Sequence, residues 1–483
     1  MMFFVSETGS YHTAAAALGT AAFICCVVYL TNALIDSRKV FSRLNRAPSF
    51  SHETEKAPVK TGQDLSYVNS FPPSQRHKIA ELGSQYANVV EEVDLATTPK
   101  PLLKLDEDYR TASPDSFSSS GFSIADIQSL GDFPDYATLS GVPLPSPLTG
   151  FNVEKAVPRP YRPFRWAYHQ TMSLTKMDTD FWIELENNYK NRIAHRQELY
   201  VKHGEDVLAC LPGSELACKK LMEMAIQFVC ARYPNQFNRD GNILVNNILG
   251  TTTDLSETEP LVVLLNNIPE DFAVMIRDHE TGRYVLRAGV VCSAVGWKIG
   301  EKMGMGLPVI HEAVPDYKEK MQFSMDRFFT KMPTNKPIQR GSWGLEMGQP
   351  LYLPSDDPEF AHRQAQRPDL KPEDIYLRVD WQTLRRLPLS GAVVFNFKAL
   401  FTPLNEFKSE PYVPSIVLKV LNEGKESILK YKGVWHVEHV AKSTLKEFER
   451  YQIENGLIER NWETHTLPES PFFRGWKMKW TVE

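Results

Sequence analysis

Cysteine is scarce in this chain, with six cysteines among 483 residues. Cys25 and Cys26 lie in an apolar segment, and the other four are scattered: Cys210, Cys218, Cys230 and Cys292. No pair has the C-x-x-C spacing of a zinc or iron–sulfur site. These features exclude a disulfide framework in a chain of this length and favour a reducing compartment.

Several sequence motifs are also absent, and the chain has no excess of basic residues. Neither G-x-G-x-x-G nor G-x-x-x-x-G-K-[ST] occurs, so a dinucleotide or P-loop site has no support. The surroundings of Ser342 lack the G-x-S-x-G pattern of hydrolases, and Asn-x-Ser/Thr sequons are absent, which fits a cytosolic location. A net charge of −5 gives no basic excess for nucleic acid, so no nucleic-acid partner is expected.

The chain exceeds the usual length of one domain, and its N-terminal part predicts a membrane anchor. After a short tail, residues 1–13, the run 14–35 carries no charged residue and is long enough to span the ~30 Å hydrocarbon core. Arg38 and Lys39 follow this run and no Lys or Arg precedes it, so the C-terminal bulk should face the cytosol. A cleavable signal peptide would have a basic start and a shorter apolar core. We expect a single transmembrane helix.

Residues 36–160 are rich in proline and serine, with Pro72-Pro73 and the run Ser116 to Ser120 as examples. Apolar residues here are isolated and have no sustained period. Such segments bury too little surface to offset their ordering entropy. The composition predicts a disordered tether.

The remaining residues, 161–483, predict one α+β domain in which helices flank a mostly antiparallel sheet. Helices are expected over 179–203, 215–233, 297–303, 317–332, 414–422 and 443–456. Strands are expected over 261–268, 273–278, 284–294, 337–346, 375–387 and 392–404, the last two joined as a hairpin by residues 388–391.

His311 is the outstanding candidate for chemistry. It lies between apolar residues and the stiff Val314-Pro315 pair, a placement that suits a metal or haem axial ligand. A core histidine that is simply hydrogen-bonded to backbone is the alternative.

Four arginines, Arg340, Arg378, Arg385 and Arg386, occur on strands that otherwise look buried. Guanidinium groups bind carboxylates through two hydrogen bonds, which would suit haem propionates or a carboxylate substrate. Arg385 and Arg386 should point to opposite faces of their strand. Ion pairing with neighbouring acids is the alternative; Asp380 is either a proton relay or a partner of Arg378, and Gln382 shares its side of the strand.

Residues 162–433 resemble the haem-dependent oxidative N-demethylase family. The resemblance rests on ordered blocks: Leu211 to Glu215, Trp297 to Gly304, His311 with Val314 to Tyr317, Arg327 to Phe329, Arg340 with Trp343, Leu377 to Pro388, and Tyr431 to Gly433. It implies a PAS-like antiparallel sheet that holds haem b, with His311 as axial ligand. Further cofactor contacts would come from Arg340, Arg385, Arg386 and Trp343, and catalytic contacts from Asp380 and Gln382.

The resemblance also implies the kind of reaction. The family's characterised branch demethylates a secondary amine with electrons from an NAD(P)H-dependent reductase, and this chain has no flavin or iron–sulfur motif of its own. We therefore expect a small organic substrate, an external redox partner and a haem monooxygenase anchored to the endoplasmic reticulum, with a homodimer as a further expectation.

Two departures from the family pattern leave an alternative open. Asp380 stands where a glutamate is common, and Ser342 stands where asparagine is frequent. Shortening an acid by one methylene withdraws it by about 1.5 Å, which is enough to impair catalysis when geometry is tight. The alternative is a non-catalytic haem- or ligand-binding PAS-like sensor or scaffold.

Overall fold

A computed structural model describes residues 101–168 and 171–480. The chain divides into two units, Met1–Thr61 and Gly62–Glu483, and all described residues belong to the second. Within these residues no helix is both long and apolar enough to cross a membrane. The predicted tail 1–13 and transmembrane helix 14–35 lie outside the described residues.

The second unit is built on a seven-stranded sheet in the order β1-β8-β9-β10-β6-β7-β2, in which every neighbouring pair is antiparallel. Its strands are β1 (Thr175–Lys176), β2 (Leu208–Cys210), β6 (Asp271–Arg277), β7 (Tyr284–Val290), β8 (Ile338–Met347), β9 (Ile375–Arg386) and β10 (Val393–Pro403). A small second sheet has the order β3 (Phe237–Asp240), β4 (Ile243–Asn246) and β5 (Thr251–Asp254). The predicted α+β class with a large antiparallel sheet is confirmed.

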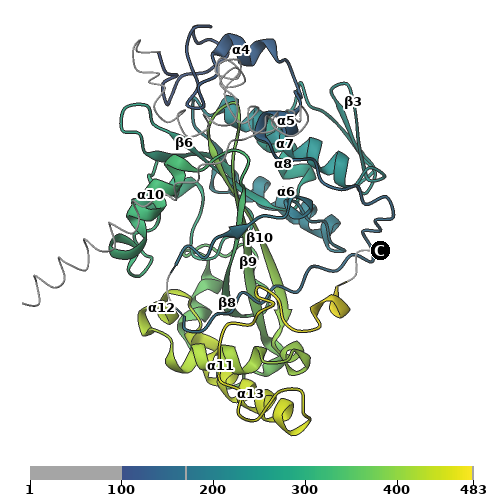
Figure 1. Ribbon diagram of the computed structural model, residues 1–483, viewed down its shortest axis with the longest axis vertical. Coiled ribbons are helices and arrows are strands. Elements are labelled where there is room, and N and C mark those ends of the chain that lie inside the picture. Colours follow the sequence, from purple (N-terminus) through teal and green to yellow (C-terminus); the bar gives the residue numbers. More distant parts are fainter. Residues whose placement is uncertain (1–100, 169–170, 481–483) are drawn as a thin grey trace, which may run out of the picture. The chain divides into compact units, whose positions relative to one another are not determined.

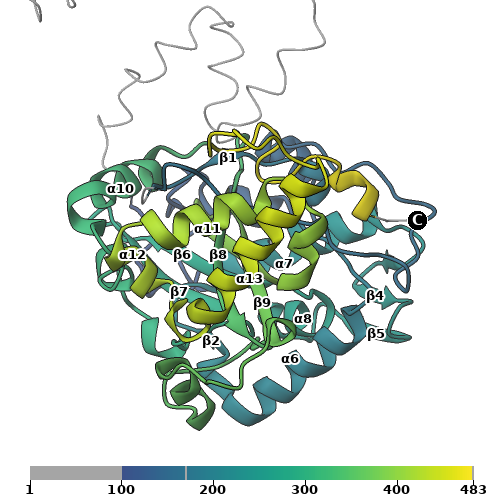
Figure 2. The same ribbon diagram turned by 90° about the horizontal axis from the view of Figure 1, so that it is seen from below.

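The α-helices are α4 (Ile124–Ser129), α5 (Tyr136–Ser140), α6 (Tyr189–His203), α7 (Glu215–Arg232), α8 (Pro260–Asn267), α9 (Leu307–Ile310), α10 (Gln322–Lys331), α11 (Val413–Glu423), α12 (Glu426–Tyr431) and α13 (Trp435–Glu454). Short helical turns η4 to η11 lie between them, and η7 (Tyr317–Met321) is a π-turn that leads directly into α10. Figure 1 shows α10 on one side of the sheet and α6, α7 and α8 on the other. The view in Figure 2 shows α11 and α13 packed side by side.

The two faces of the sheet differ in what covers them. Leu384 and Phe397 pack in one apolar cluster with Met325 of α10. Trp381 of the same strand β9 belongs to a different cluster, which contains Val417 of α11. Because successive strand residues point to opposite faces, even-numbered residues of β9 belong to the face toward α10 and odd-numbered ones to the face toward α7 and α11. We call these the α10 face and the α7 face.

The hairpin of β9 and β10 is the best-predicted part of the fold. The two strands pair without interruption from Val393↔Arg386 to Pro403↔Tyr376. By contrast, the predicted strand 261–268 is wrong, because this apolar run forms helix α8, with Pro260 in its first turn. Its side chains Leu261, Val263, Leu264 and Leu265 are all buried, and such a run fits a buried helix as well as a strand.

The structure also corrects the predicted tether 36–160 for its second half. Ile124, Ile127 and Leu139 belong to the apolar cluster of α7 and α8, and the buried hydroxyl of Tyr136 donates a hydrogen bond to Glu223 in α7. These apolar residues show no period in the sequence because they pack from loops and from two helices of six and five residues. Residues 36–100 lie outside the described residues.

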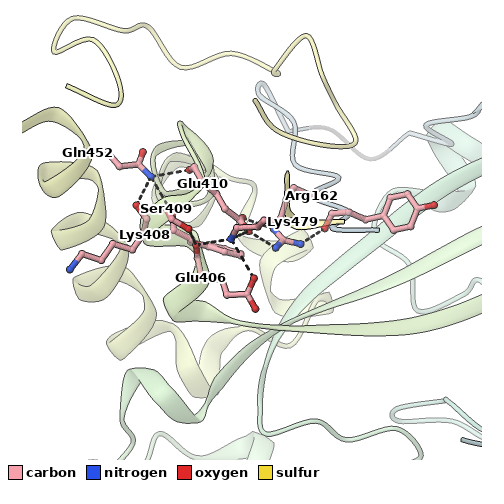
Figure 3. A network of polar contacts seen from close by, with 9 residues as sticks. Arg162, Glu406, Lys408, Ser409, Glu410, Gln452 and Lys479 are labelled. Atoms are coloured by element: carbon pink, nitrogen blue, oxygen red, sulfur yellow. Dashed lines mark hydrogen bonds and ion pairs between the residues drawn. The ribbon is translucent and has the colours of Figure 1, made fainter. Parts of the chain in front are cut away.

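A network of buried charged side chains surrounds the turn after β10 (Figure 3). Arg162 donates two hydrogen bonds to the carboxylate of Glu410, at 2.7 and 2.6 Å, and Lys479 adds a third at 2.9 Å. The side chains of Arg162 and Glu410 are 2% and 0% exposed. Gln452 of α13 donates to three backbone carbonyls in the same turn, those of Phe407, Lys408 and Glu410. The network therefore links four parts of the chain: the segment around Arg162 that leads into the domain, the turn after β10, helix α13 and the C-terminal segment.

Candidate functional site

His311 is the C-cap of the short helix α9, which begins with a proline in its first turn. Its Nδ1 lies 2.8 Å from the carbonyl oxygen of Leu307, and its ring stacks on Tyr317 with centroids 4.9 Å apart and planes 8° from parallel. Because a carbonyl oxygen only accepts, Nδ1 carries the proton and Nε2 keeps its lone pair. Histidines that bind metals are held by this kind of second hydrogen bond.

The surroundings of His311 disfavour the protonated form of its imidazole. Burial lowers the pKa of His311, and the positive charges of Lys302 and Arg340 lower it further. The apolar cluster beside it is incompletely covered: Trp297, Met303, Ile310, Val314, Phe328 and Phe395 are only partly buried. A histidine nitrogen that keeps its lone pair, near partly uncovered apolar side chains, is a donor set that fits a haem.

A hollow of about 760 Å³, including its open mouth, lies beside the edge of β8. Its lining contains the cations Arg165, Arg340 and Lys432 and no aspartate or glutamate. Hydroxyl and aromatic side chains complete it: Tyr168, Thr171, Ser173, Thr175, Ser342, Trp343, Trp381, Tyr431 and Ser470. A lining with three cations and no acid predicts a ligand that carries negative charge.

Hydrogen-bond donors without acceptors point the same way. The buried Nε of Arg340 has no acceptor in the described part of the chain, and the same is true of Nε1 of Trp343 and Nε1 of Trp381. Trp343 and Trp381 are 3% and 5% exposed. Buried donors are nearly always paired in folded proteins, so these three donors are available to the acceptor atoms of a group bound in the hollow.

Lys432, which follows α12, is the least expected member of the hollow. Its Nζ donates to the carbonyl oxygen of Trp343 at 2.5 Å and lies 4.7 Å from the centroid of that tryptophan ring. Burial and, to a smaller extent, the charge of Arg340 lower the pKa of Lys432 to about 7, against the opposing effect of Asp380. The only signal in the sequence was its place in the last block of the family resemblance, which gave it no role.

Three predicted residues meet on the α10 face of the sheet. Arg340 lies opposite Gln382 in the pairing of β8 and β9, and Ser342 lies opposite Asp380. Asp380 forms an ion pair with Arg378, whose Nε and Nη2 lie 3.0 and 2.9 Å from its Oδ1. The carboxylate still has 30% of its side chain exposed. Arg340, Asp380 and Gln382 therefore form one polar band.

The structure does not bring Arg385 and Arg386 to this band. Arg385 lies on the α7 face, with its guanidinium carbon 4.1 Å from the centroid of the Trp182 ring, and burial lowers its pKa to about 10. Arg386 donates to the carbonyl oxygens of Met332 and Gly391 at 2.6 and 2.8 Å, and so closes the end of α10. The prediction that these two arginines point to opposite faces is confirmed. Trp343, the remaining predicted contact, lies on the α7 face and lines the hollow.

In the comparison with protein families, residues 173–442 match the family described as haem-dependent oxidative N-demethylase, alpha subunit-like. The matched stretch is more than half of the 483-residue chain. It contains His311, β8 to β10, and Lys432.

Proposed function

This chain belongs to the haem-dependent oxidative N-demethylase, alpha subunit-like, family, and from that premise we propose that it is a haem-dependent monooxygenase. Its substrate would be a small organic molecule, and oxidative removal of an N-methyl group is the reaction we favour. One observation carries the proposal: His311 offers a neutral Nε2 among incompletely covered apolar side chains, and Arg340, which lowers its pKa, lines an acid-free cationic hollow.

We assign His311 as the axial ligand of haem b. Its hydrogen bond to the carbonyl of Leu307 and its stacking on Tyr317 hold the imidazole ring in one orientation. The ring therefore loses little conformational freedom when Nε2 binds the cofactor. Bound haem would supply dioxygen activation. The PAS-like character of the sheet around it belongs to the same proposal.

Arg340 and Lys432 are the groups we propose for carboxylates, either the propionates of the cofactor or an acidic group on the substrate. Neither cation has a carboxylate partner within the described residues. Trp343 forms a wall of the same hollow. Cationic side chains in a desolvated site bind anions more strongly than they would in water.

Asp380 and Gln382 are the proposed catalytic residues. Asp380 keeps an exposed part on the polar band and is held by Arg378, so it would position and transfer a proton at its free carboxylate oxygen. Gln382 is partly buried on the same face, between Arg340 of β8 and Phe397 of β10. It would orient the substrate through its amide.

The protein's setting forms a further part of the proposal. Electrons would come from an external NAD(P)H-dependent reductase, because the chain has no flavin or iron–sulfur motif. The apolar run 14–35 would anchor the protein to the endoplasmic reticulum with the domain in the cytosol, next to that partner. A homodimer remains a prediction.

A non-catalytic haem- or ligand-binding sensor is the second candidate. The observation that favours it is the ion pair of Asp380 with Arg378, because Arg378 also donates to the carbonyl oxygens of Ser293 and Pro350 and so holds the acid in place. An acid held in this way is less free to relay protons.

A turnover assay separates the two candidates. The full chain in detergent, loaded with haem, would be incubated with NADPH, a microsomal reductase and a panel of secondary and tertiary methylamines. Formaldehyde release that fails with Asp380→Asn supports the monooxygenase. Stable haem and reversible ligand binding, with no formaldehyde from any amine, would support the sensor.

A further inference from the structure

Cys210 and Cys218 lie side by side although the sequence shows no cysteine motif there. Cys210 ends the edge strand β2, and Cys218 lies in the first turn of α7. Their sulfur atoms are 3.8 Å apart, and the Sγ of Cys210 lies 3.1 Å from the hydroxyl of Ser214. A disulfide requires about 2.05 Å between the sulfurs. A small movement of the turn from Leu211 to Ser214, which brings the two sulfurs about 1.75 Å closer, would therefore allow the bond to form.

The two thiols are unequal in a way that suits a pair with divided roles. Cys210 is exposed, whereas Cys218 is buried with 3% exposure. A hydrogen bond from Cys218 is the main cause that lowers the pKa of Cys210 to about 7, whereas the pKa of Cys218 is raised well above its usual value by the same hydrogen bond and by burial. At neutral pH a large part of Cys210 is thiolate, the reactive form of cysteine.

We propose that Cys210 and Cys218 are a site of oxidative modification, in which Cys210 reacts with a hydroperoxide and Cys218 then closes an intramolecular disulfide. In the first step the thiolate of Cys210 attacks one peroxide oxygen. The S–O bond forms, the O–O bond breaks, the sulfur is oxidised by two electrons, and the oxygen released takes up a proton to leave as water or an alcohol.

The second step uses only groups of this pair. The sulfur of Cys218 attacks the sulfenic sulfur of Cys210, the S–S bond forms and the S–O bond breaks. The hydroxide that leaves takes the proton of the Cys218 thiol and departs as water. One hydroperoxide is consumed for each disulfide, and a dithiol reductant reverses the change.

The other described cysteines lack this arrangement and provide the control. Burial raises the pKa of Cys230 to about 11 and that of Cys292 to about 12. Neither has a sulfur partner within residues 101–168 and 171–480. Thiols of this kind react slowly with peroxide.

The test uses the reduced full chain in detergent, treated with hydrogen peroxide at neutral pH, alkylated and mapped by peptide mass spectrometry. The expected product is a cross-linked peptide that contains Cys210 and Cys218 and disappears on treatment with dithiothreitol. Its rate of formation should rise about tenfold between pH 6 and pH 8, following the thiolate fraction of Cys210.

Two variants assign the roles. Cys218→Ser should accumulate a dimedone-reactive sulfenic acid at Cys210, whereas Cys230→Ser should behave as the wild type. The proposal is overturned if folded wild-type protein keeps both thiols alkylatable, or if Cys210 becomes oxidised without the cross-link. If Cys218→Ser does not fold, the wild-type cross-link and its pH dependence decide the matter alone.

Discussion

Lys432 should make anion binding to the hollow depend on pH near neutrality. Burial brings its pKa to about 7, so it is charged below that pH and neutral above it. The groups that face it do not change charge in the same range: Arg340 stays charged, and the pKa of Tyr168 is raised to about 12. A carboxylate should therefore bind more weakly as the pH rises from 6 to 8.

The size of the effect follows from the contact that is lost. A hydrogen bond to a charged group contributes about 1.5–3 kcal/mol, so complete loss of the Lys432 charge would weaken binding about 10- to 150-fold. With a pKa of about 7, the charged fraction of Lys432 falls about tenfold between pH 6 and pH 8, so the affinity should fall about 5- to 10-fold over that range. Arg340 and the unpaired indole N–H groups of Trp343 and Trp381 remain at high pH, so binding should weaken rather than disappear.

Titration calorimetry with propionate as the probe measures this at pH 6, 7 and 8. The variant Lys432→Met keeps most of the side-chain stem and removes the charge, so it should bind more weakly than the wild type at pH 6, by a margin that narrows toward pH 8, and its own affinity should not change with pH. Lys430→Met, which alters an exposed lysine in the helix α12 that Lys432 follows, serves as the matched control. A pH-independent affinity in the wild type, or a drop that persists in Lys432→Met, would refute the reasoning.

Three other substitutions, one of them paired with a control substitution, test separate parts of the structure. Glu410→Gln leaves Arg162 buried without its counter-charge and should cost about 3–5 kcal/mol in urea denaturation, whereas Asp369→Asn, at a pair with side chains 49% and 67% exposed, should cost at most about 1 kcal/mol. Equal costs would contradict the assigned network. Gly213→Ala would place a methyl group 2.2 Å from the carbonyl oxygen of Leu105 at a φ of +84°, so it should lower the melting temperature; an unchanged melting temperature would show that residues 101–123 do not pack there. Arg385→Met should leave haem content unchanged, because Arg385 lies on the α7 face; loss of haem would place that face at the site.

The sequence predicted those parts of the fold whose signals are local. The long hairpin of β9 and β10 has strand-like runs on both sides of a Pro-Leu-Ser-Gly turn, and α7 has a helical period that ends before Pro234. The alternation of a strand was also enough to separate Arg385 from Arg386. These features need no knowledge of tertiary contacts.

The failures came where tertiary packing decides the outcome. A run such as 261–268 is apolar on all sides, so its length and composition allow either a helix or a strand until its neighbours are known. Residues 101–160 looked like a tether because their apolar side chains pack from irregular backbone. Lys432 and the Cys210–Cys218 pair are sites made by contacts across loops, which no spacing rule for a single segment detects.

The central claim is that His311 binds haem iron, and the absorption spectrum of the full chain tests it most directly. The protein would be expressed with a haem precursor and purified in detergent together with His311→Ala and His439→Ala, the latter altering an exposed histidine on α13. The wild type and His439→Ala should show a near-stoichiometric Soret band, and in His311→Ala the band should shift or be lost while the protein stays folded. A folded wild-type protein without a Soret band, or a His311→Ala variant with an unchanged band, would contradict the assignment.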